Sequence, residues 1–204
     1  VVGAPLAFSF GAFRLDANGH ADTTFAAGGR AIITFDDPTL SMIAGNSTVN
    51  IDGQGRILMT GTVAGSNSFI ENFAAARLNA DGTPDVSFGS GGLVVVDIGD
   101  HDAHASCAML DDAGRIVLAG SAGVPPVNSI FPNYNVAALR LLDDGALDTS
   151  FGDGGLTLLP IDLVQDGTDG ALAGIELDGG KVLVVGTAGT DNGGGNAFAL
   201  QLDA

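Results

Sequence analysis

One short segment gathers three side chains of the kinds that bind transition metals. His101, His104 and Cys107 follow one another at intervals of three residues in the stretch HDAHASC. Imidazole nitrogens and thiolate sulfur are zinc ligands, so the segment is a candidate metal site. On a strand, however, side chains three residues apart point to opposite faces, and the segment occurs only once in the chain. This geometry favours incidental histidines and a buried thiol over a metal site or a Cys–His nucleophilic pair.

Acidic and amide side chains around glycine form a second candidate site, which is repeated. Oxygen ligands that alternate around a glycine resemble the start of a calcium-binding loop. The glutamate that closes an EF-hand loop is absent, and the same side chains stabilise turns through local hydrogen bonds. The sequence therefore favours turn structure, with structural Ca²⁺ as the alternative. The residues concerned are Asp16, Asn18, Asp22, Asn79, Asp81, Asp85, Asp144 and Asp148.

A third candidate site lies in the stretch AGVPPVNSIFPNYN, which differs in length from its counterparts elsewhere in the chain. It contains Phe131, Asn133, Asn135 and the only tyrosine, Tyr134. Variable loops on a rigid scaffold often carry binding sites, and amides beside aromatic rings suit a carbohydrate or a protein ligand. The alternative is a simple connection between strands.

Paired carboxylates would support hydrolysis. Asp97, Asp102, Asp162 and Asp166 are candidates for the acid and base of a glycosidase. Aspartates are so abundant in this chain that some pair by accident, so a hydrolase site is kept only as an alternative.

These residues belong to an internal repeat. Arg14, Arg77 and Arg140 are 63 residues apart, and two further phrases recur in order between them. An Asp-Gly or Asn-Gly turn precedes each phrase of the type FGSGG, and a D-x-x-G-[RK] turn follows later; both turns predict hairpins. We expect the phenylalanine of the FGSGG-type phrase to fill the space between adjacent units, and its aspartate to hold the turn.

The strand count indicates the architecture. Four short strands for each unit of about 63 residues are typical of a β-propeller blade. The sequence predicts an all-β, β-propeller-type array of three four-stranded blades in one domain, with units at 12–73, 74–136 and 137–198 and terminal strand pieces at 1–11 and 199–204. Three blades are fewer than the ~4–8 that close a ring. We therefore expect a larger propeller, or one completed by a second copy or by another chain.

Composition limits the possible partners. The 204-residue chain is 46% hydrophobic, but no apolar run approaches the ~18 residues that cross a bilayer. A net charge of −17 disfavours nucleic acid and anionic membranes as partners. The N-terminus shows no signal-peptide pattern, and the single cysteine allows no internal disulfide.

The repeated phrases resemble a known family. At ARLNADGTPDVSFGSGG and GRIVLAG the sequence is similar to the delta-60 repeats of bacterial proteins, and the resemblance covers essentially the whole chain. It implies a β-propeller that is commonly part of large secreted or surface-associated proteins, so the expected location is extracellular, cell-surface or periplasmic. It implies no activity. The chain departs from the family pattern at Ala26, Leu142 and Gln201.

The sequence thus favours a non-catalytic binding or structural module of an exported bacterial protein. A hydrolase with its site on the propeller face is one alternative, and a calcium-stabilised surface protein is another. No cofactor other than Ca²⁺ is indicated.

Overall fold

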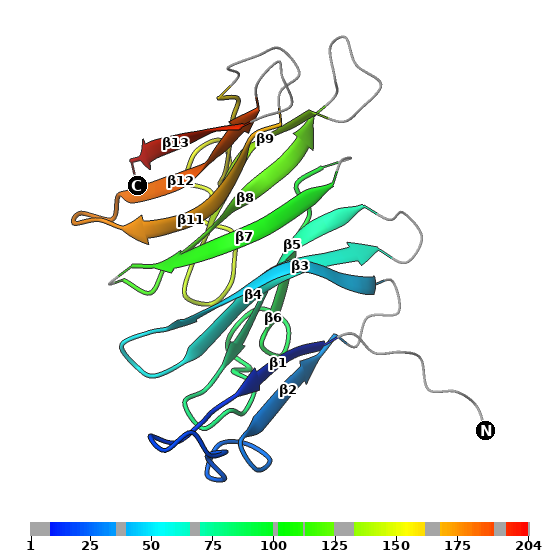
Figure 1. Ribbon diagram of the computed structural model, residues 1–204, viewed down its shortest axis with the longest axis vertical. Helices are drawn as coiled ribbons and strands as arrows, with labels where there is room; N and C mark the ends of the chain where they lie inside the picture. Colours follow the sequence, from blue (N-terminus) through cyan, green and yellow to red (C-terminus); the bar gives the residue numbers. More distant parts are fainter. Residues whose placement is uncertain are drawn as a thin grey trace.

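The computed structural model describes residues 9–35, 40–65, 70–99, 102–111, 113–124, 133–161, 168–189 and 195–203, of which 40–47 and 65 are described by their backbone alone. Thirteen strands form four antiparallel sheets, which follow one another along the molecule (Figure 1). Within the described ranges there is no helix long and apolar enough to cross a membrane. The fold is all-β, as the many aspartate and glycine turns predict.

The strands enter the sheets in sequence order. The first sheet contains β1 (Ser9–Phe13) and β2 (Arg30–Thr34), and the second contains β3 (Leu40–Ile51), β4 (Ile57–Gly65), β5 (Glu71–Leu78) and β6 (Leu93–Val96). The third contains β7 (Ala103–Leu110), β8 (Ile116–Val124), β9 (Asn133–Leu141) and β10 (Leu156–Leu159), and the fourth contains β11 (Gly170–Glu176), β12 (Val182–Gly189) and β13 (Gly195–Leu202).

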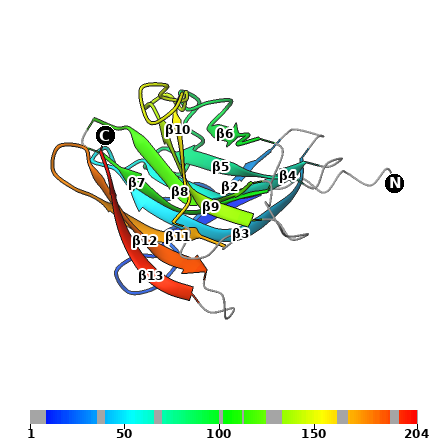
Figure 2. The ribbon, with the colours of Figure 1, turned by 90° about the horizontal axis from the view of Figure 1, so that it is seen from above.

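In the second and third sheets the first two strands are joined by the D-x-x-G turn. In the second sheet, Oδ1 of Asp52 accepts hydrogen bonds from the amides of Gln54 and Arg56 at 2.8 and 2.9 Å. The first strands of successive sheets lie next to one another, and Asn50 of β3 donates its amide to the Ala108 carbonyl of β7 at 3.1 Å. The fourth strands β6 and β10 lie together at another border of the stack (Figure 2).

The connection from the third strand to the fourth contains two turns rather than one tight hairpin. β5 leads into the turn Asn79–Gly82, which is closed by an antiparallel bridge between Leu78 and Pro84. The chain then passes Phe88 and its glycines before β6 pairs with β5. The Asp-Gly signal therefore marks a small turn beside β5. The phenylalanine turn lies between this small turn and β6.

The core consists of three apolar clusters, one in each space between adjacent sheets. Phe25 lies in the cluster between the first and second sheets, Phe88 in the next and Phe151 in the last. Their exposed fractions are 0%, 0% and 3%, so the expectation that these rings fill the spaces between units is confirmed. Burial of an aromatic ring in each space is the main apolar contact that recurs along the stack.

Glycine in each Asp-Gly turn allows the turn to lie against the preceding phenylalanine. A Cβ added to Gly82 would lie 2.7 Å from Cε2 of Phe25, and one added to Gly145 would lie 3.0 Å from Cδ2 of Phe88. Both glycines also have φ near +86°, at +87° and +85°. The same turns accept backbone hydrogen bonds from the preceding phenylalanine turn, from Ala26 to Asp81 at 2.7 Å and from Gly89 to Asp144 at 2.8 Å.

The boundaries of the repeat units do not coincide with the boundaries of the sheets. The unit 12–73 supplies β2 to the first sheet and both β3 and β4 to the second. Each unit therefore covers parts of two neighbouring sheets and links them covalently.

Removing one of these rings tests their contribution to stability. We expect Phe88→Ala to lower the free energy of unfolding by about 3–5 kcal/mol, because a fully buried ring leaves a cavity. Val86→Ala is the control, since Val86 is 78% exposed in the same turn and its loss costs little. Urea denaturation of both variants measures the difference. Equal, small losses in the two variants would contradict this role for Phe88.

Candidate binding site where the variable loops begin

Each phenylalanine turn contains the same group of side chains. In the second sheet, Nε of Arg77 donates to Oδ2 of Asp85 at 2.7 Å, and the guanidinium carbon lies 4.6 Å from the centre of the Phe88 ring. Oδ1 of Asp85 accepts from the amide and the hydroxyl of Ser87 at 3.0 and 2.6 Å. The equivalent Nε–Oδ2 distance is 2.8 Å for both Arg14–Asp22 and Arg140–Asp148.

The candidate calcium ligands lie in these turns and make turn hydrogen bonds. Oδ1 of Asp16 accepts from the amides of Asn18 and His20, while Asp81 accepts from Thr83 and Asp144 accepts from the Ala146 amide. Asn79 donates its side-chain amide to Thr83. Among the described residues no three His, Cys, Asp or Glu side chains form a group that could hold a metal ion. Calcium binding stays a prediction.

At the ends of the strands that carry the D-x-x-G turns, ion pairs link neighbouring sheets. Asp143 accepts from Nη2 of Arg56 at 2.6 Å and from Nη1 of Arg77 at 2.9 Å. Arg56 also pairs with Asp52 at 2.5 Å. The hydrogen bond to Asp143 is the largest effect on Arg56, and it raises the pKa of this guanidinium above its ordinary value. These pairs border a depression of about 430 Å³.

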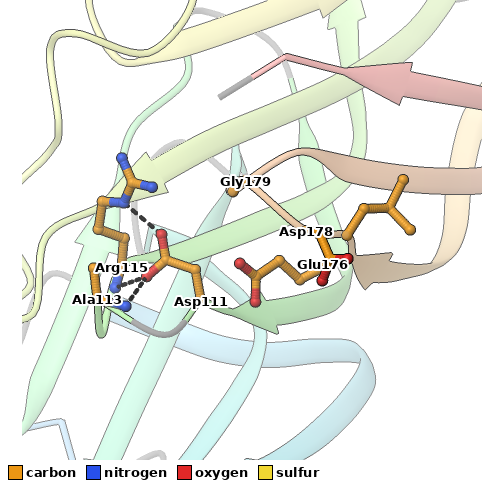
Figure 3. A pocket seen from close by; sticks show the side chains of 8 residues that line it. Asp111, Ala113, Arg115, Glu176, Asp178 and Gly179 are labelled. Atoms are coloured by element: carbon orange, nitrogen blue, oxygen red, sulfur yellow. Dashed lines mark hydrogen bonds and ion pairs between the residues drawn. The ribbon is translucent and has the colours of Figure 1, made fainter.

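A second depression at this end, of about 580 Å³, lies between the turns of the third and fourth sheets. Figure 3 shows Arg115 bonded to Asp111, with the Glu176 carboxylate extending toward them from β11. In the fourth sheet Leu177 and Lys181 take the places of Asp111 and Arg115, as the Leu177 amide bond to the Lys181 carbonyl shows. Both depressions are built from positions of the repeat, so the architecture alone accounts for them.

A different cluster lies at the opposite end of the strands, where β5, β7 and β9 begin and the variable segments connect them. Nδ1 of His104 lies 2.6 Å from Oε2 of Glu71, and the ring centres of His104 and Tyr134 are 5.5 Å apart. Oδ1 of Asp102 accepts from the Glu71 amide at 3.2 Å. These four side chains come from three strands and the residue before β7. We call them the loop-end cluster.

The loop-end cluster is not imposed by the repeat. His104 pairs with Ser121 in β8, and the equivalent residue opposite Thr187 in the fourth sheet is Gly170. The His104 side chain is 40% exposed, while that of Glu71 is 15% exposed. Because the His104 ring is partly exposed, the cluster offers polar atoms to solvent.

Carboxylates around Tyr134 make this end of the molecule acceptor-rich. Burial raises the pKa of the Tyr134 phenol, and the negative charges of Asp102 and Glu71, with a hydrogen bond to Asp102, raise it further. The phenol therefore stays protonated at neutral pH and donates to Asp102. Nearby in β9, Asn133 is buried, and its side-chain oxygen has no hydrogen-bond partner among the described residues.

The predicted ligand and metal residues are only partly brought together. Tyr134 and His104 were assigned to two different candidate sites, but the structure places them in one cluster. The side-chain oxygens of Asn135 and of Asn72, at the equivalent position of β5, are both buried and have no hydrogen-bond partner in the part of the chain that the structure describes, which points to a feature of the repeat. His101, Phe131, Asp162 and Asp166 lie outside the described residues, and Asp97 accepts from the Gly99 amide.

Cys107 lies apart from the loop-end cluster. Its side chain packs in the apolar cluster between the third and fourth sheets, and burial raises the pKa of the thiol to about 11. A thiol with this pKa is protonated at neutral pH and is a poor nucleophile or metal ligand.

Sequence reasoning missed Glu71. It is one of only two glutamates in the chain, and this rarity is the one signal that could have drawn attention to it. Its contact with His104 joins strands of different sheets, and no local spacing encodes such a contact.

One family model matches part of the chain. Residues 55–88 match the model described as "Domain of unknown function (DUF5122) beta-propeller". The matched stretch runs from the D-x-x-G turn through β4 and β5 to Phe88. The search of curated proteins finds no match to the chain. The family match and the row of antiparallel sheets together indicate a β-propeller domain.

The buried Arg77–Asp85 pair gives an expectation for acid stability. Burial alone would raise the pKa of Asp85, but hydrogen bonds from Ser87 and Arg77 outweigh it and hold the pKa below its ordinary value of 3.8. The stability that the ionised carboxylate contributes is therefore present above about pH 3.8 and is lost as the pH falls through the lowered pKa.

We expect Asp85→Asn to destabilise the protein by about 3–5 kcal/mol at neutral pH, since it removes the buried carboxylate of Arg77 and leaves this arginine only the half-exposed Asp143. The difference from the unmodified protein should shrink below about pH 3.8. Asp22→Asn is the matched control, because the side chains of Arg14 and Asp22 are 38% and 24% exposed and solvent screens the pair. Denaturant titrations across the acid range measure both. A pH-independent loss in Asp85→Asn would contradict the assignment.

Proposed function

We propose that the chain is a non-catalytic binding module of the β-propeller type, built from delta-60-type repeats, and that its ligand binds at the loop-end cluster. The observation that carries this proposal is that Glu71, Asp102, His104 and Tyr134 converge without being required by the repeat. By contrast, the arginine–aspartate pair of each phenylalanine turn recurs from sheet to sheet and serves the architecture.

The chemistry of the cluster supports a neutral, hydroxyl-rich ligand such as an oligosaccharide. Glu71 and Asp102 supply carboxylate acceptors, and the partly exposed ring of His104 adds a further polar group. Sugar hydroxyls donate to such groups, and the ring of Tyr134 gives an apolar surface for a sugar face. The net charge of −17 disfavours anionic ligands by long-range repulsion.

The resemblance to repeats of exported bacterial proteins supports an extracellular or cell-surface setting for this module. Such a setting is also one in which neutral glycans are available as ligands. The proposed site does not include Cys107, because this thiol is buried apart from the loop-end cluster and its pKa is raised to about 11.

His104→Ala and Tyr134→Ala test the proposal. We expect a panel of neutral oligosaccharides, screened by NMR titration, to contain at least one that binds and perturbs the His104 ring signals. Each variant should weaken that binding about tenfold or more, because it removes a hydrogen bond or a stacking surface.

His20→Ala is the matched control, because His20 is an exposed histidine in the Asp16 turn, and it should bind as the unmodified chain does. If no neutral oligosaccharide binds, or if His20→Ala weakens binding equally, the ligand assignment is wrong. Hydrolysis of the bound sugar in the same sample would overturn the non-catalytic part of the proposal.

A further inference from the structure

In the first two phenylalanine turns the arginine makes a hydrogen bond to the next sheet, and in the third no described residue supplies that contact. Nη1 of Arg14 donates to the Ala80 carbonyl at 2.7 Å, and Nη1 of Arg77 donates to Asp143 at 2.9 Å. Ala80 and Asp143 are equivalent residues of successive Asp-Gly turns. Nη1 of Arg140 is buried and has no hydrogen-bond partner among the described residues. A buried, charged donor without an acceptor is costly, so an acceptor is expected here.

The backbone next to Arg140 lacks the corresponding partner as well. The amides of Ala26 and Gly89 donate to carbonyls of the following Asp-Gly turn, at Asp81 and Asp144. Gly152 is the equivalent residue of the third phenylalanine turn, and none of the described residues accepts a hydrogen bond from its amide. The Arg140 turn is thus ready to receive an Asp-Gly turn through two hydrogen bonds.

One turn of the Asp-Gly type in the same chain lies against no phenylalanine turn. The turn Asp16–Gly19 follows β1, and a Cβ added to Gly19 would meet no atom within 4 Å, whereas Gly82 and Gly145 lie against phenylalanine rings. The residues before it are exposed, with Phe13 at 74% and Leu15 at 60%. This turn therefore has the shape and the carbonyls of its two counterparts but has no phenylalanine turn beneath it.

The register of the strands shows where this free turn would fit. β12 pairs with β13 through Val185 and Ala199, and the equivalent pairs in the inner sheets are Thr60–Ala75 and Ala119–Ala138. The residue of β1 equivalent to Ala199 is Ala12, two residues before Arg14, as Ala75 is two before Arg77. β1 is thus an alternative partner for β12.

The strand that now holds this position is less buried than its counterparts. In β13 only Leu202 is buried, whereas β5 and β9 are buried over most of their length. β13 also carries Gln201 where β1 carries Arg14, so it lacks the arginine that pairs with an aspartate in each phenylalanine turn. Its outer edge is without a fourth strand in the described residues.

We propose that β1 and β2 of a second copy of this chain replace β13 beside β12 and complete the fourth sheet. The carbonyl of Ala17 from the second copy then accepts from Arg140, and that of Asn18 accepts from Gly152. Gly19 covers Phe151 as Gly82 covers Phe25. The exchange is reciprocal, so each copy completes the other in a closed dimer.

This pairing also accounts for the number of sheets. Two copies contribute six four-stranded sheets, which is within the ~4–8 that close a β-propeller. It removes the open faces of the first and fourth sheets, where Ile32, Ile175 and Val185 are now exposed at 51%, 58% and 41%. The inference is independent of the proposed ligand, since the loop-end cluster is formed by the second and third sheets.

Gly19→Ala is the first test. We expect the unmodified protein to show twice the mass of the 20.2 kDa chain by light scattering on a sizing column. Gly19→Ala should raise the dimer dissociation constant about tenfold or more, because the added Cβ overlaps Phe151 of the partner. Gly28→Ala is the matched control, with a similar positive φ, +68° against +81°, and likewise no atom within 4 Å.

The control separates the interface from local strain. The glycines equivalent to Gly28 are Gly91 and Gly154. A Cβ added to either would meet no atom within 4 Å, so the Gly28→Ala protein should remain dimeric. A monomeric unmodified protein, or equal behaviour of the two variants, would overturn the proposal.

A disulfide trap tests the strand exchange directly. Residues paired across antiparallel strands have Cα atoms about 4.5–5.5 Å apart, which a disulfide can span. In the exchanged dimer Ala12 of one copy pairs with Val185 of the other, so the double variant Ala12→Cys, Val185→Cys should give a covalent dimer on a non-reducing gel. In a single chain the two residues lie in sheets at opposite ends of the stack (Figure 1). A dimer that forms no covalent link in this variant would overturn the exchange.

Discussion

The stack depends on a buried guanidinium that is shared between two sheets. Arg77 is 1% exposed, and its desolvation is offset by Asp85 within its own turn, by Asp143 of the next sheet and by the face of Phe88. Because the positive charge needs both carboxylates and the ring together, it fixes the separation and rotation of neighbouring sheets. The apolar clusters supply most of the driving force, but they are less directional. The arginine selects one packing arrangement from those that burying the phenylalanine would allow.

Most of the local structure could be predicted from the sequence. The D-x-x-G turns and the apolar runs around them mark β3, β4, β7, β8, β11 and β12, because turn chemistry and alternating burial are local properties. The role of Phe88 could also be inferred, since a large ring that recurs at a fixed period requires a recurring space.

The contacts that define the candidate site could not be predicted. Arg77 reaches Asp85 across an intervening turn, and Glu71 reaches His104 between sheets, so neither spacing matches a helix or a strand. The small number of basic residues limits how many carboxylates can form ion pairs. Six of the seven basic residues form ion pairs with carboxylates, and acidic residues outnumber basic ones by 24 to 7. This excess gives the chain its net charge of −17.

The contacts between the sheets also bear on how such a chain changes length. The first two phenylalanine turns bond to the Asp-Gly turn of the next sheet through the arginine and one backbone amide, and each phenylalanine ring packs only between adjacent sheets. Stability is therefore the sum of nearest-neighbour terms. An internal duplication of one 63-residue period recreates each of these bonds at the new junction and breaks none elsewhere. Gene segments of this length can thus be gained or lost without redesign of the remaining sheets.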